Sequence, residues 1–248
     1  MTAKQVDSTR DLRSLERLVP DDLSSTDVTG TTTLGLHLAR YQLAQRHARG
    51  RILDMACGVG YGTRLLADHG RDVTEAVGVD RSADAVAYAT RRYQREGVRF
   101  VCEDALRFHD DDGFDTVVSL ETIEHVDDPD KLIVRLIAAL RPGGVLITSV
   151  PTTPSADVNP HHLHDFTEAS FRAIVERYGM REIDQLRQVQ PYELWGVLTR
   201  TEPRMNTMRS SLTSYYLRHP RAAARRLAAT VRYGFTNRYV TIAWERAQ

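Results

Sequence analysis

The sequence predicts an α/β fold built on a doubly wound, mostly parallel sheet, and three observations support this prediction. Short apolar runs of strand length alternate with longer amphipathic runs between residues 51 and 150. A glycine-rich turn, within RILDMACGVGYG at 51–62, follows the first apolar run. The second apolar run, VGVD, ends in the acidic residue Asp80. This order of strand, glycine turn, helix and acid-terminated strand is typical of a crossover that binds a nucleoside.

The N-terminal part is predicted as a flexible lead-in, a Thr/Gly/Asp loop over 26–33 and a covering helix over Leu34–His47. Asp128-Pro129 is expected to open a later helix because proline is tolerated in the first turn, and Arg-Pro-Gly-Gly at 141–144 is expected to close it. The core strands are predicted at 51–55, 75–79, 98–102, 114–120 and 144–150, and the intervening helices at 62–69, 82–96 and 129–140.

The C-terminal part is predicted as a histidine-containing loop after Pro151, a helix over Glu168–Tyr178 and two further strands, Glu182–Val189 and Tyr239–Trp244. An Arg- and Ala-rich stretch with helical spacing, 201–233, separates those two strands and is predicted as a helical insertion or lid. The predicted division is a lead-in and cover (1–50), a cofactor-binding core (51–200), a helical insertion (201–236) and the last of seven strands (237–248).

Composition limits the expected surroundings and partners. The 248 residues include 33 basic and 33 acidic ones, so there is no overall field to attract nucleic acid or anionic lipid. Cys57 and Cys102 lie in predicted core segments, which argues against a disulfide scaffold and fits a reducing cytoplasm. No stretch approaches the run of about 20 apolar residues that spans a bilayer. We therefore expect a soluble cytoplasmic protein with no membrane partner.

The glycine turn and Asp80 predict an adenosine-type ligand. Gly58, Gly60 and Gly62 allow a tight turn that brings backbone N–H groups close to a ligand at the start of the next helix. The Asp80 carboxylate offers only acceptors and would accept hydrogen bonds from a ribose diol.

The residues around the turn favour a cationic ligand over a pyrophosphate. A nicotinamide-binding turn needs a glycine at its sixth position, which is Thr63 here. Asp54, just before the turn, would repel a pyrophosphate but attract an ammonium and a sulfonium. S-adenosylmethionine carries both cations and is the cofactor we expect.

Five segments in order resemble those of class I S-adenosylmethionine-dependent methyltransferases, over residues 51–190 at least. They are DMACGVGYG, VGVD, CEDAL at 102–106, FDTVVSLETIEHV at 114–126 and LRPGGVLITSVP at 140–151. The further segments ERLVPDD, ARY, ETIEHV and NPHHLHDF resemble a bacterial subgroup that modifies sugars and secondary metabolites, as in antibiotic biosynthesis. The resemblance implies a seven-stranded Rossmann-like methyltransferase sheet and, most often, small-molecule O-methylation.

The resemblance also implies a cofactor site. Asp104 would lie at the adenine amino group, Ala105 would supply a backbone contact, and Tyr61, Arg40 and Tyr41 would line the methionine end. The full expected set is Asp54, Ala56, Gly58, Gly60, Tyr61, Asp80, Arg81, Asp104, Ala105, Glu121, Arg40 and Tyr41.

The candidate catalytic residues follow the fourth predicted strand. Methyl transfer is an in-line displacement that needs an aligned nucleophile and, for a hydroxyl acceptor, help with its proton. His125 and Glu124 are the expected catalytic residues, with His125 as a base that titrates near neutral pH. The Glu-x-x-Glu-His pattern resembles metal-using methyltransferases of small-RNA 3′ ends and quinone precursors. Mg²⁺ or another divalent ion is therefore an alternative, with ligands Glu121, Glu124, His125 and His162.

Several functions remain open at this point. The first is O-methylation of a sugar-containing or secondary-metabolite acceptor. N-methylation of an amino sugar or other amine fits the same motifs, and so does RNA 3′-terminal 2′-O-methylation, although zero net charge argues against it. A non-catalytic cofactor-binding module and a nicotinamide oxidoreductase are more remote.

The expected partners are a small-molecule acceptor and, in one arrangement, a second copy of the chain in a homodimer. Two groups of residues are candidates for contacting the acceptor: the aromatic residues Tyr192, Trp195, Tyr215 and Tyr216, and the arginines Arg218, Arg221, Arg225, Arg226 and Arg232 as a phosphate grip.

Overall fold

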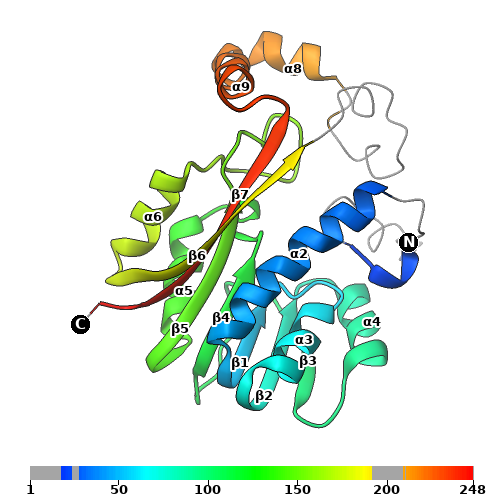
Figure 1. The fold of residues 1–248 in the computed structure, drawn as a ribbon, viewed down its shortest axis with the longest axis vertical. Coiled ribbons are helices and arrows are strands. Elements are labelled where there is room, and N and C mark those ends of the chain that lie inside the picture. Colours follow the sequence, from blue (N-terminus) through cyan, green and yellow to red (C-terminus); the bar gives the residue numbers. More distant parts are fainter. Residues whose placement is uncertain (1–17, 24–27, 192–208, 210, 248) are drawn as a thin grey trace, which may run out of the picture.

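The computed structural model describes residues 18–23, 28–191, 209 and 211–247, and it is organised around one seven-stranded sheet (Figure 1). The strand order is β3-β2-β1-β4-β5-β7-β6, with β7 antiparallel to both of its neighbours. The prediction of a doubly wound, mostly parallel sheet is therefore confirmed. The strands are β1 (Arg49–Met55), β2 (Arg71–Asp80), β3 (Val98–Cys102), β4 (Phe114–Leu120), β5 (Leu140–Pro151), β6 (Met180–Pro191) and β7 (Thr236–Arg246).

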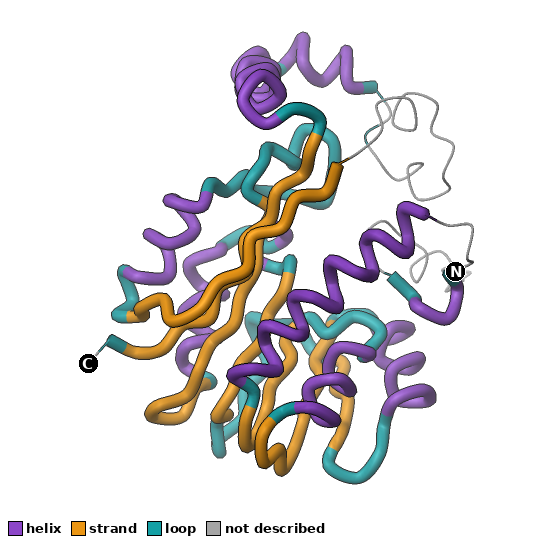
Figure 2. The backbone as a smooth tube through the Cα atoms, viewed as in Figure 1, coloured by secondary structure: helices purple, strands orange, loops and turns teal. Residues whose placement is uncertain are grey.

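Helices cover both faces of the sheet (Figure 2). One core cluster joins α2 and α3 to the strands and includes Leu43, Ala44 and Leu66. A second and larger cluster, on α5 and α6, includes Leu132, Phe171 and Trp244 of β7. The helical elements are η1 (Pro20–Asp22), α2 (Val28–His47), α3 (Tyr61–His69), α4 (Ala83–Tyr93), η2 (Ile123–His125), α5 (Pro129–Ala138), α6 (Glu168–Glu176), α8 (Leu212–Arg218) and α9 (Pro220–Tyr233).

Side-chain caps fix where the core helices begin. The Ser82 hydroxyl accepts a hydrogen bond from the backbone N–H of Ala85 at the start of α4. The Asp128 carboxylate, just before Pro129, accepts one from the backbone N–H of Lys131 at the start of α5. Thr167 caps α6 in a reciprocal arrangement with Ser170. The predicted opening of α5 at Asp-Pro is confirmed.

The structure corrects two expectations. Residues 28–33, predicted as part of a loop, form the first turns of α2. Packing against β6 overrides the weak helix propensity of this Thr/Gly stretch, because Gln190 Nε2 donates to Thr33 Oγ1 at 3.3 Å and Gln188 Nε2 to the Leu36 carbonyl at 3.0 Å. Cys102 is exposed, not buried, because it ends the edge strand β3, whereas Cys57 is buried as expected.

Helices α8 and α9 lie between β6 and β7, within the range predicted as an insertion, of which 201–208 and 210 are outside the described residues. Strands β6 and β7 pair from Met180 with Arg246 to Pro191 with Thr236. In Figure 1 this long pair carries α8 and α9 beyond the end of the sheet. Within the described part of the chain, no helix has the length and apolar character needed to cross a membrane.

Candidate active site

The glycine turn links β1 to α3 at the carboxyl edge of the sheet. Gly60 has a φ of 86°, and a Cβ there would lie 2.6 Å from the Ala89 Cβ, so this position requires glycine. Gly58 also has a positive φ, 57°, but a Cβ added to it would meet nothing within 4 Å. The turn is therefore packed against the protein at Gly60 and faces open space at Gly58, where a ligand can approach the backbone closely.

Asp80 fastens the glycine turn to the end of β2. Its two carboxylate oxygens accept hydrogen bonds from the backbone N–H groups of Gly58 and Ser82, each at 2.9 Å. The residue is 7% exposed. A carboxylate oxygen can accept more than one hydrogen bond, so these two bonds do not prevent a ribose hydroxyl from donating to the same group.

Asp54, at the end of β1, is almost completely buried. Its carboxylate accepts a 2.7 Å hydrogen bond from the Thr63 hydroxyl and a 3.3 Å bond from the Tyr41 hydroxyl. Burial raises its pKa to about 7, although these two hydrogen bonds lower it, and the nearby Asp80 adds to the rise. The carboxylate is thus held under the glycine turn in an environment that favours a compensating positive charge.

Tyr41 joins the covering helix α2 to this site. A Cβ on Gly62 would lie 1.8 Å from the Tyr41 ring, so the third glycine of the turn makes room for α2. The Tyr41 ring also meets the Tyr61 ring edge-on, and the Tyr61 hydroxyl lies 2.7 Å from His37 Nδ1. Both predicted tyrosines therefore lie beside the glycine turn, on the α2 face.

Two non-glycine residues with left-handed backbone flank the point where the strand order reverses. Ala56 follows β1 with a φ of 62°, and Glu121 follows β4 with a φ of 50°. Such conformations are costly outside glycine and are concentrated at functional sites. In open α/β sheets this crevice, between the carboxyl ends of adjacent strands such as β1 and β4, is where ligands bind.

Glu121 is held by β5 and by α2. The Ser149 hydroxyl donates to Glu121 Oε1 at 2.7 Å and accepts from the Glu121 backbone N–H at 2.9 Å. A guanidinium nitrogen of the buried Arg40 lies 3.9 Å from Glu121 Oε2. The predicted cofactor residues Arg40 and Glu121 therefore form one charged pair at the carboxyl end of β4.

Arg40 is held by two residues that no sequence motif singles out. Gln188 of β6 accepts a 2.8 Å hydrogen bond from Arg40 Nε, and the Tyr239 ring of β7 lies 4.5 Å from the guanidinium carbon. Because these partners are separated from Arg40 by long stretches of sequence, no local pattern could have identified them.

Three potential metal ligands converge after β4. One ligand atom from each of Glu124, His125 and His162 lies within 4.8 Å of the other two, and Glu124 is fully buried. Glu121 is not a member of this group. Three of the four residues predicted as metal ligands therefore lie close together, while the fourth, Glu121, contacts Ser149 and Arg40.

The hydrogen bonds of His125 define its tautomer. Its Nδ1 lies 3.1 Å from the His161 carbonyl oxygen, which can only accept, so Nδ1 carries a proton. The Nε2 of a neutral His125 then presents a lone pair to Glu124 Oε1 at 4.0 Å. A buried carboxylate oxygen that faces the lone pair of a partly exposed imidazole favours a cation or a proton between them.

The loop that carries His162 is tied to the segment after β4. The backbone carbonyl of Glu124 accepts from the N–H groups of Leu163 and His164, and His162 Nδ1 lies 2.6 Å from the Ser155 hydroxyl. The rings of His125 and His162 meet edge to face with centroids 4.6 Å apart. These contacts place residues 37 positions apart in one cluster.

The predicted adenine turn lies beyond β3. The Asp104 side chain accepts a 2.8 Å hydrogen bond from the Leu106 backbone N–H, and both Asp104 and Ala105 are partly exposed. Arg81, directly after Asp80, is exposed at the surface. Arg81, Asp104 and Ala105 all follow the carboxyl ends of the parallel strands β2 and β3, the end at which Asp80 also lies.

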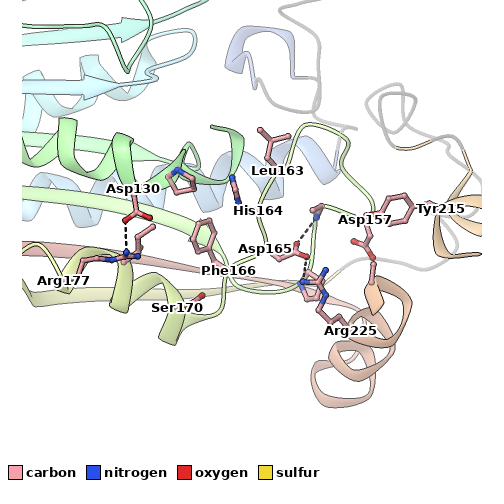
Figure 3. Close-up of a pocket in the computed structure, with 15 residues that line it drawn as sticks. Asp130, Asp157, Leu163, His164, Asp165, Phe166, Ser170, Arg177, Tyr215 and Arg225 are labelled. Atoms are coloured by element: carbon pink, nitrogen blue, oxygen red, sulfur yellow. Dashed lines mark hydrogen bonds and ion pairs between the residues drawn. The ribbon is translucent and has the colours of Figure 1, made fainter. Parts of the chain in front are cut away.

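A cavity of about 620 Å³ lies beside the loop that carries His162 (Figure 3). Its lining is mixed: Phe166, Leu163 and Ile174 are apolar, whereas two ion pairs, Arg177 with Asp130 at 3.1 Å and Arg225 with Asp165 at 3.6 Å, are charged. His164 and Tyr215 add polar groups. Such a lining suits a ligand with both donors and acceptors.

Asp157, in the loop between β5 and α6 that also carries His162, anchors helices α8 and α9. This carboxylate is 2% exposed and pairs with Arg226 of α9, and it accepts a 2.6 Å hydrogen bond from the Tyr216 hydroxyl. These charged and hydrogen-bonded partners hold the Asp157 pKa below its usual range, although burial opposes this. Of the aromatic residues expected near an acceptor, Tyr215 lines the cavity, and Tyr192 and Trp195 lie outside the described residues.

Sequence comparison connects this architecture to known proteins. A family model described as a methyltransferase domain matches residues 53–148, from β1 to β5. A probable S-adenosylmethionine-dependent methyltransferase of Mycolicibacterium smegmatis is 34% identical over 157 residues, which are 60% of each chain. A ubiquinone biosynthesis O-methyltransferase of Coxiella burnetii is 34% identical over 101 residues, 40% of this chain and 42% of the relative. The matches thus span less than two thirds of these curated relatives.

Structure comparison supports the fold over nearly the whole chain. The N-methyltransferase NodS from Bradyrhizobium japonicum WM9, solved in complex with S-adenosyl-L-homocysteine, aligns with a TM-score of 0.60. The alignment covers 98% of this chain and 100% of NodS at 15% identity, which establishes a shared fold alone.

Proposed function

Because this chain carries a class I S-adenosylmethionine-dependent methyltransferase domain, we propose that it transfers the methyl group of S-adenosylmethionine to a hydroxyl of a small, polar acceptor. The cluster of Glu124, His125 and His162 would assist as a divalent-cation site. The observation that carries the proposal is the convergence of one oxygen-bearing and two nitrogen-bearing side chains within 4.8 Å at the carboxyl end of β4.

The residues around the cofactor support its proposed orientation. Asp80, Asp104 and Ala105 lie at the ends of β2 and β3 and would bind the adenosine part. Asp54 and the Arg40–Glu121 pair lie towards β4 and would bind the methionine end. The cofactor would thus lie along the carboxyl ends of the strands, with its adenosine at β3 and β2 and its methionine near β4. The methyl group would then face the Glu124 cluster, which follows β4.

The donor set of the cluster fits a divalent cation. Imidazole and carboxylate together suit several divalent metals, and His125 presents Nε2 because Nδ1 donates to a carbonyl. Such an ion, when bound, acts as a Lewis acid that lowers the pKa of a hydroxyl next to it.

The methyl transfer itself requires alignment more than special chemistry. The acceptor oxygen would attack the methyl carbon from the side opposite sulfur, and the carbon–sulfur bonding pair would return to sulfur. With the cation bound, the His125 Nε2 lone pair would hold the ion and the hydroxyl proton would pass to water, whereas without the cation the proton would pass to His125 Nε2. The mixed polar lining of the adjacent cavity favours a hydroxyl-rich acceptor, such as one that contains a sugar.

The test is calorimetric titration of Mn²⁺ into the full chain with S-adenosylhomocysteine present. We expect one site, with affinity reduced at least about tenfold in Glu124→Gln and in His125→Gln. His109→Gln is the matched control, because that histidine is 72% exposed. Equal Mn²⁺ affinity in all four proteins would contradict the cation site.

Turnover separates the remaining functions. The assay compares 3,4-dihydroxybenzoate with 4-hydroxybenzoate and glucosamine, before and after chelation and with Mg²⁺ restored. Metal-dependent methylation of the vicinal diol supports the proposal, whereas chelator-resistant O-methylation assigns His125 as a metal-free base. Methylation of glucosamine at its nitrogen, and not at a hydroxyl, would favour the amine-acceptor alternative, and a steeply salt-dependent affinity for RNA 3′ ends would favour terminal RNA methylation.

A further inference from the structure

The helical pair α8–α9 is the most basic part of the described chain. Residues 209–235 contain six arginines and neither aspartate nor glutamate, although the whole chain is neutral. The rest of the chain therefore carries a net negative formal charge. The net charge of the whole chain is zero although its positive and negative charges lie in different regions. The argument from net charge against an anionic partner therefore does not apply to α8–α9.

One face of α9 fixes the helix to the protein. Ala222 is buried, and Arg226, one turn later, pairs with Asp157 of the loop after β5. Arg226 also donates to the carbonyl of Pro154 at 2.5 Å. Because these contacts use a single face, the opposite face of α9 points away from the protein.

That opposite face is apolar. Leu227 and Val231, one helical turn apart, are 66% and 81% exposed. Two more large apolar side chains flank the helix: Leu217 at the end of α8 is 80% exposed, and Phe235 just after α9 is 50% exposed. Leu227 and Val231 thus form an exposed apolar stripe along α9, and exposed apolar surface of this kind marks interaction sites.

A row of arginines borders this apolar stripe. Arg221, Arg225 and Arg232 lie at spacings of four and seven residues, which places them along one side of α9, between the face that contacts the protein, where Arg225 pairs with Asp165, and the face that carries Leu227 and Val231. All three are exposed. Helix α9 thus combines an apolar outer stripe with a cationic margin.

We propose that α8–α9 docks on the surface of an anionic lipid bilayer. An apolar stripe with a basic margin, lying flat in the interface, buries its apolar side chains among acyl chains and places its arginines at the phosphates. Nucleic acid would pair with the arginines but leave the leucine and valine side chains exposed. A twofold dimer through the same stripe would bring two arginine rows together, and their charges would repel.

The placement of α8–α9 allows this docking without rearrangement of the core. Figure 1 shows the two helices beyond the end of the sheet, on the long β6–β7 pair. No helix in the described residues is built to cross a bilayer, so the contact is peripheral and depends on lipid charge.

The experiment is flotation of the full chain with vesicles of phosphatidylcholine alone or with phosphatidylglycerol added. We expect binding only to the phosphatidylglycerol vesicles and release at high salt. Leu227→Gln with Val231→Gln should reduce the partition coefficient at least about tenfold, through lost apolar burial. Arg221→Gln with Arg232→Gln should reduce it roughly ten- to thirtyfold, through lost attraction.

Matched variants elsewhere serve as controls. Val134→Gln replaces an exposed valine of α5, and Arg71→Gln with Arg107→Gln removes the same charge from exposed positions outside α8–α9. These controls should bind vesicles like the unmodified chain. Equal weakening by the control pair, or no binding to phosphatidylglycerol vesicles, would overturn the proposal. So would a stripe variant that converts a dimer to a monomer in light scattering without changing vesicle binding.

Discussion

The carboxyl edge of the sheet has two halves that are built in different ways. In the cofactor half, around β1 and β2, the polar side chains bond to groups close in sequence: Asp54 to Thr63, nine residues away, and Asp80 to Gly58, 22 residues away. In the other half, beyond β4, His125 bonds to His161 and Asp157 to Arg226, 36 and 69 residues apart. The first half depends on one short motif and on Tyr41 of the preceding helix α2, whereas the second depends on how long loops and an insertion are placed.

The largest expected effect breaks the packing of the cofactor half. Gly62→Ala places a Cβ within 1.8 Å of the Tyr41 ring, and we expect the free energy of unfolding to fall by about 3 kcal/mol or more. Gly35→Ala in α2 is the control, because its added Cβ meets nothing within 4 Å and should stabilise by up to about 1 kcal/mol. Urea unfolding measures both. Tyr41→Leu should recover part of the loss, and identical behaviour of the two alanine variants would contradict the packing.

The next effect concerns the buried charge at Asp54. Because its folded pKa is raised to about 7 from an ordinary value of 3.8, its contribution to stability is fully present below about pH 4 and is lost as pH rises through 7. An asparagine amide at this position cannot ionise. We therefore expect Asp54→Asn to gain stability relative to the unmodified chain by a few kcal/mol between pH 4 and pH 8. Urea unfolding across this range is the measurement, and parallel pH curves for the two proteins would show that Asp54 is not desolvated.

A smaller effect is expected on cofactor binding by Asp80, in the cofactor half. Asp80→Ala removes the acceptors that hold Gly58 and that would bind the ribose, and we expect the affinity for S-adenosylhomocysteine to fall by about 1–3 kcal/mol. Asp111→Ala, at a carboxylate with 96% exposure, is the control. Calorimetry measures both affinities, and an unchanged value in Asp80→Ala would remove the ribose role.

The same contrast explains what the sequence could predict. Strand positions, the opening of α5 and the glycine turn follow from local patterns, and the sheet confirms them. Glu121 shows where local reasoning fails. The Glu-x-x-Glu-His pattern groups it with Glu124 and His125, whereas in the structure its backbone is left-handed and its side chain contacts Ser149. Gln188 and Tyr239 reach Arg40 only through the β6–β7 pair, which no spacing along the chain reveals.

That β6–β7 pair has a consequence for how such a chain can vary. Pro191 and Thr236 are register partners at the end of two antiparallel strands, so the two points where the inserted segment leaves and rejoins the sheet are neighbours. Adjacent strands lie only about 5 Å apart, a gap that a two-residue turn can bridge. The segment between these two residues can therefore be exchanged, lengthened or deleted while the β6–β7 pairing keeps its register. The inserted segment can thus diverge among related chains while the sheet stays the same.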